Sequence, residues 1–203
     1  PHKTPLKKIG LVSSFASDFK KISEEYSSFA AIGHVRYSTI GKSELFNAQP
    51  LKVKDLCIAH NGTISNVDEL SNMVGGCSFT PQNASDTLVV AERLVSLISE
   101  KGKLVDALSI LKNEMVGSYC FTFLTDDSSV FAARDPRGFR PLVLGEKKDG
   151  ATFIVASESS ALSAIGAELK RDVTPGELIK FSKNGIENEM FSKEVSRAHC
   201  SFE

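Results

Sequence analysis

The segment best suited to chemistry is a polar stretch that follows an apolar run. Leu56 to His60 is mainly apolar and leads directly into Asn61-Gly62. An Asn-Gly pair after a strand is a common hairpin-turn signal, because both residues accept positive φ. A helix start expected at Asn66 leaves too little chain for a return strand of ordinary length. In the second interpretation Asn61 ends a strand at an exposed edge, where its amide and the Gly62 N–H can donate to a ligand. Spacing alone leaves both interpretations open.

Two charged residues elsewhere could take part in the same chemistry. Arg36 lies at the end of a strand expected from Ala30 to Tyr37, ahead of a small, flexible series that includes Gly41. A guanidinium beside a glycine-hinged loop suits a two-point grip on a carboxylate, although a single Arg after a strand is more often a solvated surface residue. Asp86 lies in the first turn of an expected helix, where the helix dipole alone stabilises an acid. Without other evidence, this stabilisation is a sufficient reason for an acid at position 86.

The hydrophobic pattern predicts the elements that position these residues. Apolar runs rich in β-branched and aromatic residues predict strands at about 30–37, 56–60, 118–124, 130–134, 141–144, 152–156, 177–181 and 186–191. Helical spacing of apolar residues predicts one helix over about 85–99, starting at Ser85-Asp86, and another after Gly102. A third helix is expected over about 158–165, with Ser157 as its N-cap.

Turn residues indicate how the strands connect. Most connections are short, so we expect largely antiparallel sheets. Asp135 to Gly138 fits a type I turn, with Pro136 presetting φ at its second position, and this turn would join 130–134 and 139–144 in a hairpin. No repeat, low-complexity stretch or linker divides the chain. Strands grouped around a helical middle therefore indicate a single α+β domain over residues 1–203.

Composition excludes several classes of protein. With 203 residues the chain is long enough for one globular core, and 24 Lys+Arg against 25 Asp+Glu give a net charge of -1, which disfavours nucleic-acid and membrane-surface binding. The four cysteines, Cys57, Cys77, Cys120 and Cys200, form no C-x-x-C pair, so we expect reduced thiols rather than disulfides or metal ligands. No apolar run approaches the ~18 residues of a membrane span, and the first residues lack a signal-peptide pattern. We expect a cytoplasmic protein.

Motifs along the chain point to one family. They occur in the order Gly33 to Thr39, Asn47 to Leu51, His60 to Gly62, Ser85-Asp86, Arg134 to Leu142, Ala156 to Glu158, Pro175 to Glu177 and Ala198 to Glu203. Together, over nearly the whole chain, they closely resemble the glutaminase domain of the amidophosphoribosyltransferases, an N-terminal-nucleophile amidotransferase domain. The last three segments and the Arg134 to Leu142 run favour this family over the related amidotransferase that makes glucosamine 6-phosphate. That enzyme resembles the chain mainly at Arg36, Thr39 and Asn61-Gly62.

The resemblance implies a fold and a glutamine site. The fold would be a four-layer α/β/β/α sandwich. Arg36 would hold the α-carboxylate of glutamine and Asp86 its α-ammonium group. Asn61 and Gly62 would donate to the oxyanion that forms during the reaction. Each role suits its chemistry: a guanidinium fork for a carboxylate, an anion for a cation, and neutral donors where negative charge develops.

The resemblance also implies a loop and a nucleophile. Tyr37 to Asn47 would form a mobile loop over bound glutamine, with Thr39 lining the pocket. The family's nucleophile is a cysteine at the mature N-terminus, whose own α-amine takes the thiol proton. This chain begins with Pro1 and has no cysteine before Cys57. We expect that the nucleophile segment was removed rather than naturally absent, and that the polypeptide as it stands releases no ammonia from glutamine.

A second domain is implied as the partner of this one. A phosphoribosyltransferase domain of the same polypeptide would use the ammonia to aminate phosphoribosyl pyrophosphate, the first step of purine nucleotide synthesis. We expect Mg²⁺ in that domain, no cofactor or metal in residues 1–203, and a homo-oligomer. In some family members a cysteine near the position of Cys200 helps to hold an iron–sulfur cluster, but a structural or free cysteine is the expectation here. The alternative function is a glutaminase-dead relative that senses glutamine or supports an assembly.

Overall fold

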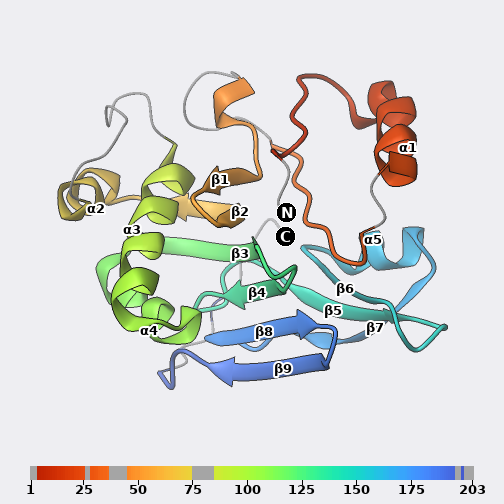
Figure 1. The fold of residues 1–203 in the computed structure, drawn as a ribbon. Coiled ribbons are helices and arrows are strands. Elements are labelled where there is room, and N and C mark those ends of the chain that lie inside the picture. The colour runs from red at the N-terminus through yellow and green to blue at the C-terminus, as the bar shows by residue number, and fades with distance from the viewer. Residues whose placement is uncertain (1–3, 26–27, 37–44, 75–84, 195–197, 199–203) are drawn as a thin grey trace.

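The computed structural model describes residues 4–25, 28–36, 45–74, 85–194 and 198. They form two antiparallel sheets with helices outside them (Figure 1). The six-stranded sheet has the order β1 (Leu51–Val53), β2 (Leu56–Ile64), β3 (Gly117–Thr125), β4 (Val130–Arg134), β8 (Glu177–Ser182) and β9 (Gly185–Met190). The three-stranded sheet has the order β6 (Phe153–Ala156), β5 (Val143–Lys147) and β7 (Ala167–Asp172).

Five α-helices lie among the described residues. They are α1 (Ala16–Glu25), α2 (Val67–Met73), α3 (Asp86–Lys101), α4 (Leu104–Glu114) and α5 (Ser159–Ala164), with short 3-10 turns at Val12–Phe15 and Leu45–Asn47. Helix α3 begins as expected, because the Ser85 side chain accepts a hydrogen bond from the Leu88 N–H at 3.3 Å. None of the described helices is both long enough and apolar enough to span a membrane.

Three apolar cores separate four layers. In β3, alternate side chains serve different cores, because successive residues of a strand point to opposite faces. Phe121 and Phe123 pack with the residues of α3 and α4, whereas Cys120 packs between the two sheets against Leu142 and Leu144. The third core lies between the small sheet and α5, and contains Val143, Leu162 and Ala167. The sandwich is therefore α/β/β/α, as the resemblance implied.

The turn at Asp135 is confirmed, but the hairpin predicted around it is wrong. Gly138 N donates to the Asp135 carbonyl at 3.0 Å, and Asp135 Oδ1 accepts the N–H groups of Arg137 and Gly138, each at 2.8 Å. Strand β4 pairs with β3 and β8, while β5 belongs to the other sheet. The chain thus crosses between the sheets at this turn.

The buried Arg134 side chain holds that crossing in place. Its guanidinium donates at 2.8 to 2.9 Å to three backbone carbonyls, those of Gly138, Arg140 and Val173. A planar group with donors on three nitrogens can satisfy several buried carbonyls at once. Much of the Arg134 to Leu142 motif therefore has a structural reason: it joins the end of β4 to the second sheet.

Several predicted bounds needed correction. Residues 30–36, the described part of the first predicted strand, carry no strand assignment. Helix α5 has Glu158 rather than Ser157 at its N-cap position, without a side-chain hydrogen bond. Three elements were missed, namely α1, β1 and β7. Strand β1 has only three residues, and β7 exposes most of its charged sequence, so neither has a strong period-two signal.

The two cysteines within the described ranges are buried thiols. Cys57 and Cys120 form no disulfide there, as expected, and burial raises the pKa of the Cys57 thiol. Cys77 and Cys200 lie outside the described residues.

Candidate functional site

Strand β2 runs straight through the Asn61-Gly62 pair. It pairs with β3 residue by residue from Leu56 to Ile64, with Asn61 opposite Cys120. The hairpin interpretation is therefore wrong, and so is the expectation that Asn61 ends the strand. Helix α2 does start after Asn66, as predicted. The pair thus lies within a strand, and its surroundings depend on which edge of β2 is open.

Among the described residues, the edge of β2 that is left open lies on the side that faces β1. Strand β1 covers β2 only at Leu56, Cys57 and Ile58. Beyond it, the His60 N–H donates to Gln49 Oε1 at 2.6 Å. Further along, the Ile64 N–H donates to Asp86 Oδ2. In an antiparallel strand alternate N–H groups point to the same edge, so the Gly62 N–H lies between two that are taken and points the same way.

Asn61 lies on the other face of the strand from His60. It shares a face with its cross-strand partner Cys120, which packs between the two sheets. The side chain of Asn61 is partly exposed and makes no hydrogen bond within the part of the chain that the structure describes. Its amide therefore remains able to donate to a ligand.

Asp86 is brought beside this edge by the start of α3. Its Oδ1 accepts the Thr87 N–H at 2.8 Å, and its Oδ2 accepts the Ile64 N–H at 3.2 Å. The side chain remains 20% exposed. Asp86 thus links the helix start to the strand while keeping part of its carboxylate open to solvent or a ligand.

A buried polar cluster joins Asp86 to the strand. His60 Nδ1 lies 3.2 Å from Thr87 Oγ1 and 3.7 Å from Asp86 Oδ2. Gln49 closes the cluster, because its Nε2 donates to Thr87 Oγ1 at 3.1 Å while its Oε1 holds the His60 N–H. Burial lowers the pKa of His60, and the nearby Asp86 carboxylate opposes this only in part. The imidazole is therefore neutral at physiological pH.

Arg36 lies in a neighbouring cavity of about 310 Å³. His34 and Gln49 line the same cavity, whereas Asn61, Gly62 and Asp86 do not. Gln49 therefore connects the cavity of Arg36 to the cluster beside Asp86. The pKa of His34 is lowered mainly by burial, and a hydrogen bond to the His60 backbone opposes the shift. Thr39, the remaining predicted site residue, lies outside the described residues, as does most of the predicted loop from Tyr37 to Asn47.

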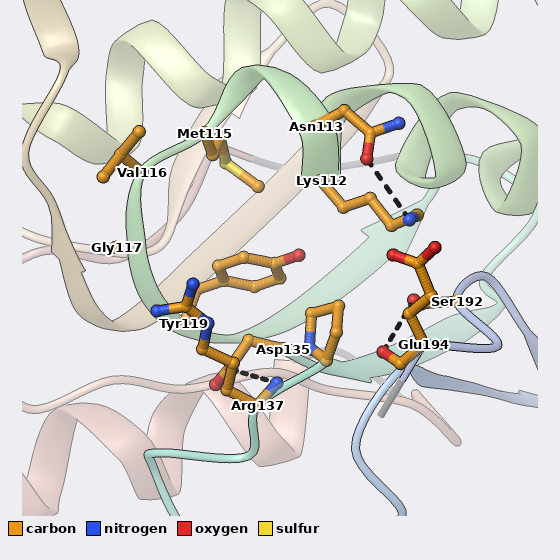
Figure 2. Close-up of a pocket in the computed structure, with 11 residues that line it drawn as sticks. Lys112, Asn113, Met115, Val116, Gly117, Tyr119, Asp135, Arg137, Ser192 and Glu194 are labelled. Carbon is orange, nitrogen blue, oxygen red and sulfur yellow. Dashed lines mark hydrogen bonds between the residues drawn. The ribbon is translucent and has the colours of Figure 1, made fainter. Parts of the chain in front are cut away.

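A second cavity lies on the helix side of the sheet (Figure 2). It measures about 500 Å³ and extends from the end of α4 to the Asp135 turn. Tyr119, opposite Gly62 in the register, contributes its ring, but its hydroxyl is buried without a hydrogen-bond partner among the described residues. Burial raises the pKa of Tyr119 and that of Asp135, whose Oδ2 has no hydrogen-bond partner in the described part of the chain either. None of Arg36, Asn61, Gly62 and Asp86 lines this cavity, so it is separate from the predicted glutamine site.

Comparison with known proteins gives the family. Residues 34–164 match the family model described as a glutamine amidotransferase domain. The chain belongs to this family. The match extends from the cavity of Arg36 through the open edge of β2 and α3 to α5, and so includes every described residue of the predicted site.

Relatives of the chain are amidophosphoribosyltransferases, in agreement with the resemblance. The enzyme of Archaeoglobus fulgidus is 40% identical over 178 residues, which are 86% of this chain and 38% of the relative. That of Bacillus subtilis is 36% identical over 180 residues, 85% of this chain and 36% of the relative. A solved structure of the glutamine phosphoribosylpyrophosphate amidotransferase from B. subtilis, complexed with ADP and GMP, matches with a TM-score of 0.70 and 32% identity, and covers 83% of this chain and 36% of that one. The chain thus spans somewhat more than a third of the length of these curated relatives.

Sequence reasoning assigned no role to three residues of the cluster. Gln49 and His60 were noted only as parts of motifs, and Thr87 was not singled out. The available signal was a polar residue at the end of an apolar run, as at His60, and a hydroxyl residue in the first turn of an apolar helix, as at Thr87. That these two side chains meet is set by how α3 packs against β2, which neither local pattern contains.

Proposed function

We propose that the complete protein hydrolyses glutamine to glutamate and ammonia, and that this domain supplies the glutamine site. The observation that supports this most directly is the open edge of β2. There the Asn61 amide, the Gly62 N–H and the Asp86 carboxylate come from adjoining segments. Two neutral donors beside one anion suit a substrate that develops an oxyanion while carrying an ammonium group.

In this proposal each residue has one task. Arg36 holds the α-carboxylate and Asp86 the α-ammonium group of glutamine. The nucleophile is the N-terminal cysteine that the family resemblance places ahead of this segment. Its thiolate attacks the side-chain amide carbon, and the carbonyl oxygen becomes an oxyanion that Asn61 and Gly62 stabilise. Ammonia leaves with a proton from the α-amine, and water then hydrolyses the thioester to glutamate.

The names of the relatives extend the proposal to the second half-reaction. We infer that the ammonia aminates phosphoribosyl pyrophosphate on a phosphoribosyltransferase domain of the same polypeptide, in a cytoplasmic homo-oligomer. We place the Mg²⁺ expected for that half-reaction in the phosphoribosyltransferase domain. Relatives in Arabidopsis are named as chloroplastic, so cell fractionation is the test of location.

Steady-state kinetics of the complete protein test the glutaminase assignment. Arg36→Lys should mainly raise KM, because Lys keeps the charge but loses the planar two-point geometry. Asn61→Ala should leave KM nearly unchanged and lower kcat by roughly 10²- to 10³-fold, since its donor acts on charge that develops in the transition state. Asn113→Ala, at the exposed end of α4, is the matched control and should match the wild type. An Asn61→Ala enzyme with a kcat within threefold of the control would show that the oxyanion assignment is wrong.

A further inference from the structure

The imidazole of His60 lies between two groups of the proposed site. On one side its Nδ1 is 3.2 Å from the Thr87 hydroxyl, and that hydroxyl is 3.3 Å from Asp86 Oδ1. On the other side its Nε2 lies over Gly62: a Cβ added to Gly62 would be 2.6 Å from this nitrogen. The ring thus connects to Asp86, the proposed ammonium-binding acid, through Thr87, and it contacts Gly62, a proposed oxyanion donor, directly.

The Thr87 hydroxyl has one hydrogen to give. Gln49 Nε2 already donates to its oxygen, so this hydrogen points either to His60 Nδ1 or to Asp86 Oδ1. If the neutral ring carries its proton on Nε2, Nδ1 accepts the hydroxyl hydrogen; if it carries the proton on Nδ1, the ring donates to Thr87 Oγ1 and the hydroxyl donates to Asp86 Oδ1. Asp86 Oδ1 keeps the Thr87 N–H at 2.8 Å in either case. Thr87 therefore links the imidazole to the Asp86 carboxylate with either tautomer.

At the Gly62 side the contact is steric. Nε2 makes no hydrogen bond of good geometry to a described residue, although the Ser118 backbone lies close enough to raise the pKa of the ring against the larger effect of burial. The ring and Ser118 together confine Gly62, so the direction of its N–H is set by packing. The His60 backbone is fixed as well, because its N–H is held by Gln49 at 2.6 Å.

A buried histidine often serves only to fill a core, and His60 does pack against Phe121 with ring centroids 5.0 Å apart. An apolar ring would fill this space without bringing a polar group out of water. His60 instead has polar contacts toward Asp86, through Thr87, and at the open strand edge, through Gln49. We propose that His60 is a positioning residue for glutamine hydrolysis, which orients Asp86 through Thr87 and fixes the Gly62 N–H by contact. This inference rests on the proposed function.

Two substitutions separate the two tasks in the complete protein. His60→Asn keeps a polar atom near the position of Nδ1 and removes the Nε2 side of the ring, so kcat should fall about tenfold or more while KM stays within threefold. His60→Gln keeps a polar group toward Gly62 and loses the contact to Thr87, so KM for glutamine should rise about tenfold or more. Thr87→Val removes the same contact from the other partner and should reproduce the increase in KM if a His60 variant fails to fold.

Ser129→Ala is the control for loss of stability alone. Ser129 is also buried and donates one hydrogen bond, to Asp127 at 3.0 Å, in the turn between β3 and β4 at the far end of β2. Ser129→Ala should lower the melting temperature without changing kcat or KM per folded molecule. If the His60 and Thr87 variants behave like this control while the wild type turns over glutamine, His60 is only a core residue and the inference is overturned. Wild-type protein that neither binds nor hydrolyses glutamine would instead overturn the proposed function, and the inference with it.

Discussion

Gly62 should be the position in β2 that is least tolerant of a side chain. Its φ is +150°, a conformation that L residues rarely adopt. A Cβ there would be 2.1 Å from the Ser118 carbonyl oxygen of β3 and 2.6 Å from His60 Nε2. The first contact involves backbone in a sheet interior, which cannot move away without breaking the ladder. Gly62→Ala therefore combines conformational strain with crowding.

Gly150 allows the two effects to be separated. Its φ is +67° and no heavy atom lies within 4 Å of a Cβ placed there, so Gly150→Ala carries the conformational effect alone. We expect about 1–2 kcal/mol for that control, from the cost of a left-handed conformation in an L residue. Crowding in a packed interior adds about 1–3 kcal/mol to the destabilisation by Gly62→Ala. For a domain of this size, where 1 kcal/mol shifts Tm by about 2–4 °C, the two variants should differ by roughly 2–12 °C.

Thermal unfolding of the two purified variants and the wild type, followed by far-UV circular dichroism, measures this difference. The wild type should have the highest Tm, Gly150→Ala a lower one and Gly62→Ala the lowest. If Gly62→Ala melts at or above the temperature of Gly150→Ala, the strand does not confine Gly62, and the argument that packing sets the direction of its N–H fails as well.

Three further predictions concern buried polar groups. Burial lowers the pKa of both His60 and His34 below the ordinary value of 6.5, so only the unfolded chain takes up these protons just below that pH. The free energy of unfolding should therefore fall as the pH decreases from 6.5 toward the lowered pKa values, and a variant with both residues changed to Gln should lose this pH dependence in urea titrations. Tyr119→Phe removes a hydroxyl that is buried without a hydrogen-bond partner among the residues that the structure describes, so Tm should stay equal or rise by a few degrees. A drop of more than about 2 °C would show that the hydroxyl is hydrogen-bonded in solution. Arg134→Lys leaves at least one of the three carbonyls that Arg134 holds without a donor and should lower the free energy of unfolding in urea by about 1–3 kcal/mol. Arg137→Lys, whose side chain makes no hydrogen bond to a described residue, should lower it by almost nothing.

The sequence predicted the strands and helices better than it predicted which strands pair with one another. Strands such as β3 and β4 and helices such as α3 follow from apolar periodicity and capping, which are local. The hairpin after β4 failed for a nonlocal reason. The turn residues around Asp135 determine the backbone conformation of four residues only. Which sheet the next strand joins depends on where its apolar side chains pack, and the Arg134 side chain holds the crossing between the two sheets in place.

The candidate site shows the same division. Residue types identified Asn61, Asp86 and Arg36 through the family motifs, while spacing alone left a hairpin turn and a strand end equally open. Neither was correct, because a positive φ at Gly62 looks the same in sequence whether it makes a turn or a close approach between strands. Only the register with β3 decides, since it brings the Ser118 carbonyl against Gly62.

That register also explains why the three residues His60, Asn61 and Gly62 must stand in this order. Residues 60 and 62 share the helix face of β2, so the imidazole needs a residue without a side chain two positions later. Residue 61 points to the opposite face, where a short amide can reach from the strand toward the open edge. Exchanging Asn61 and Gly62 would place a side chain under the imidazole and remove the amide from the inter-sheet face. The motif is therefore one geometric unit, in which a buried ring, a partly exposed amide and a bare backbone position depend on one another.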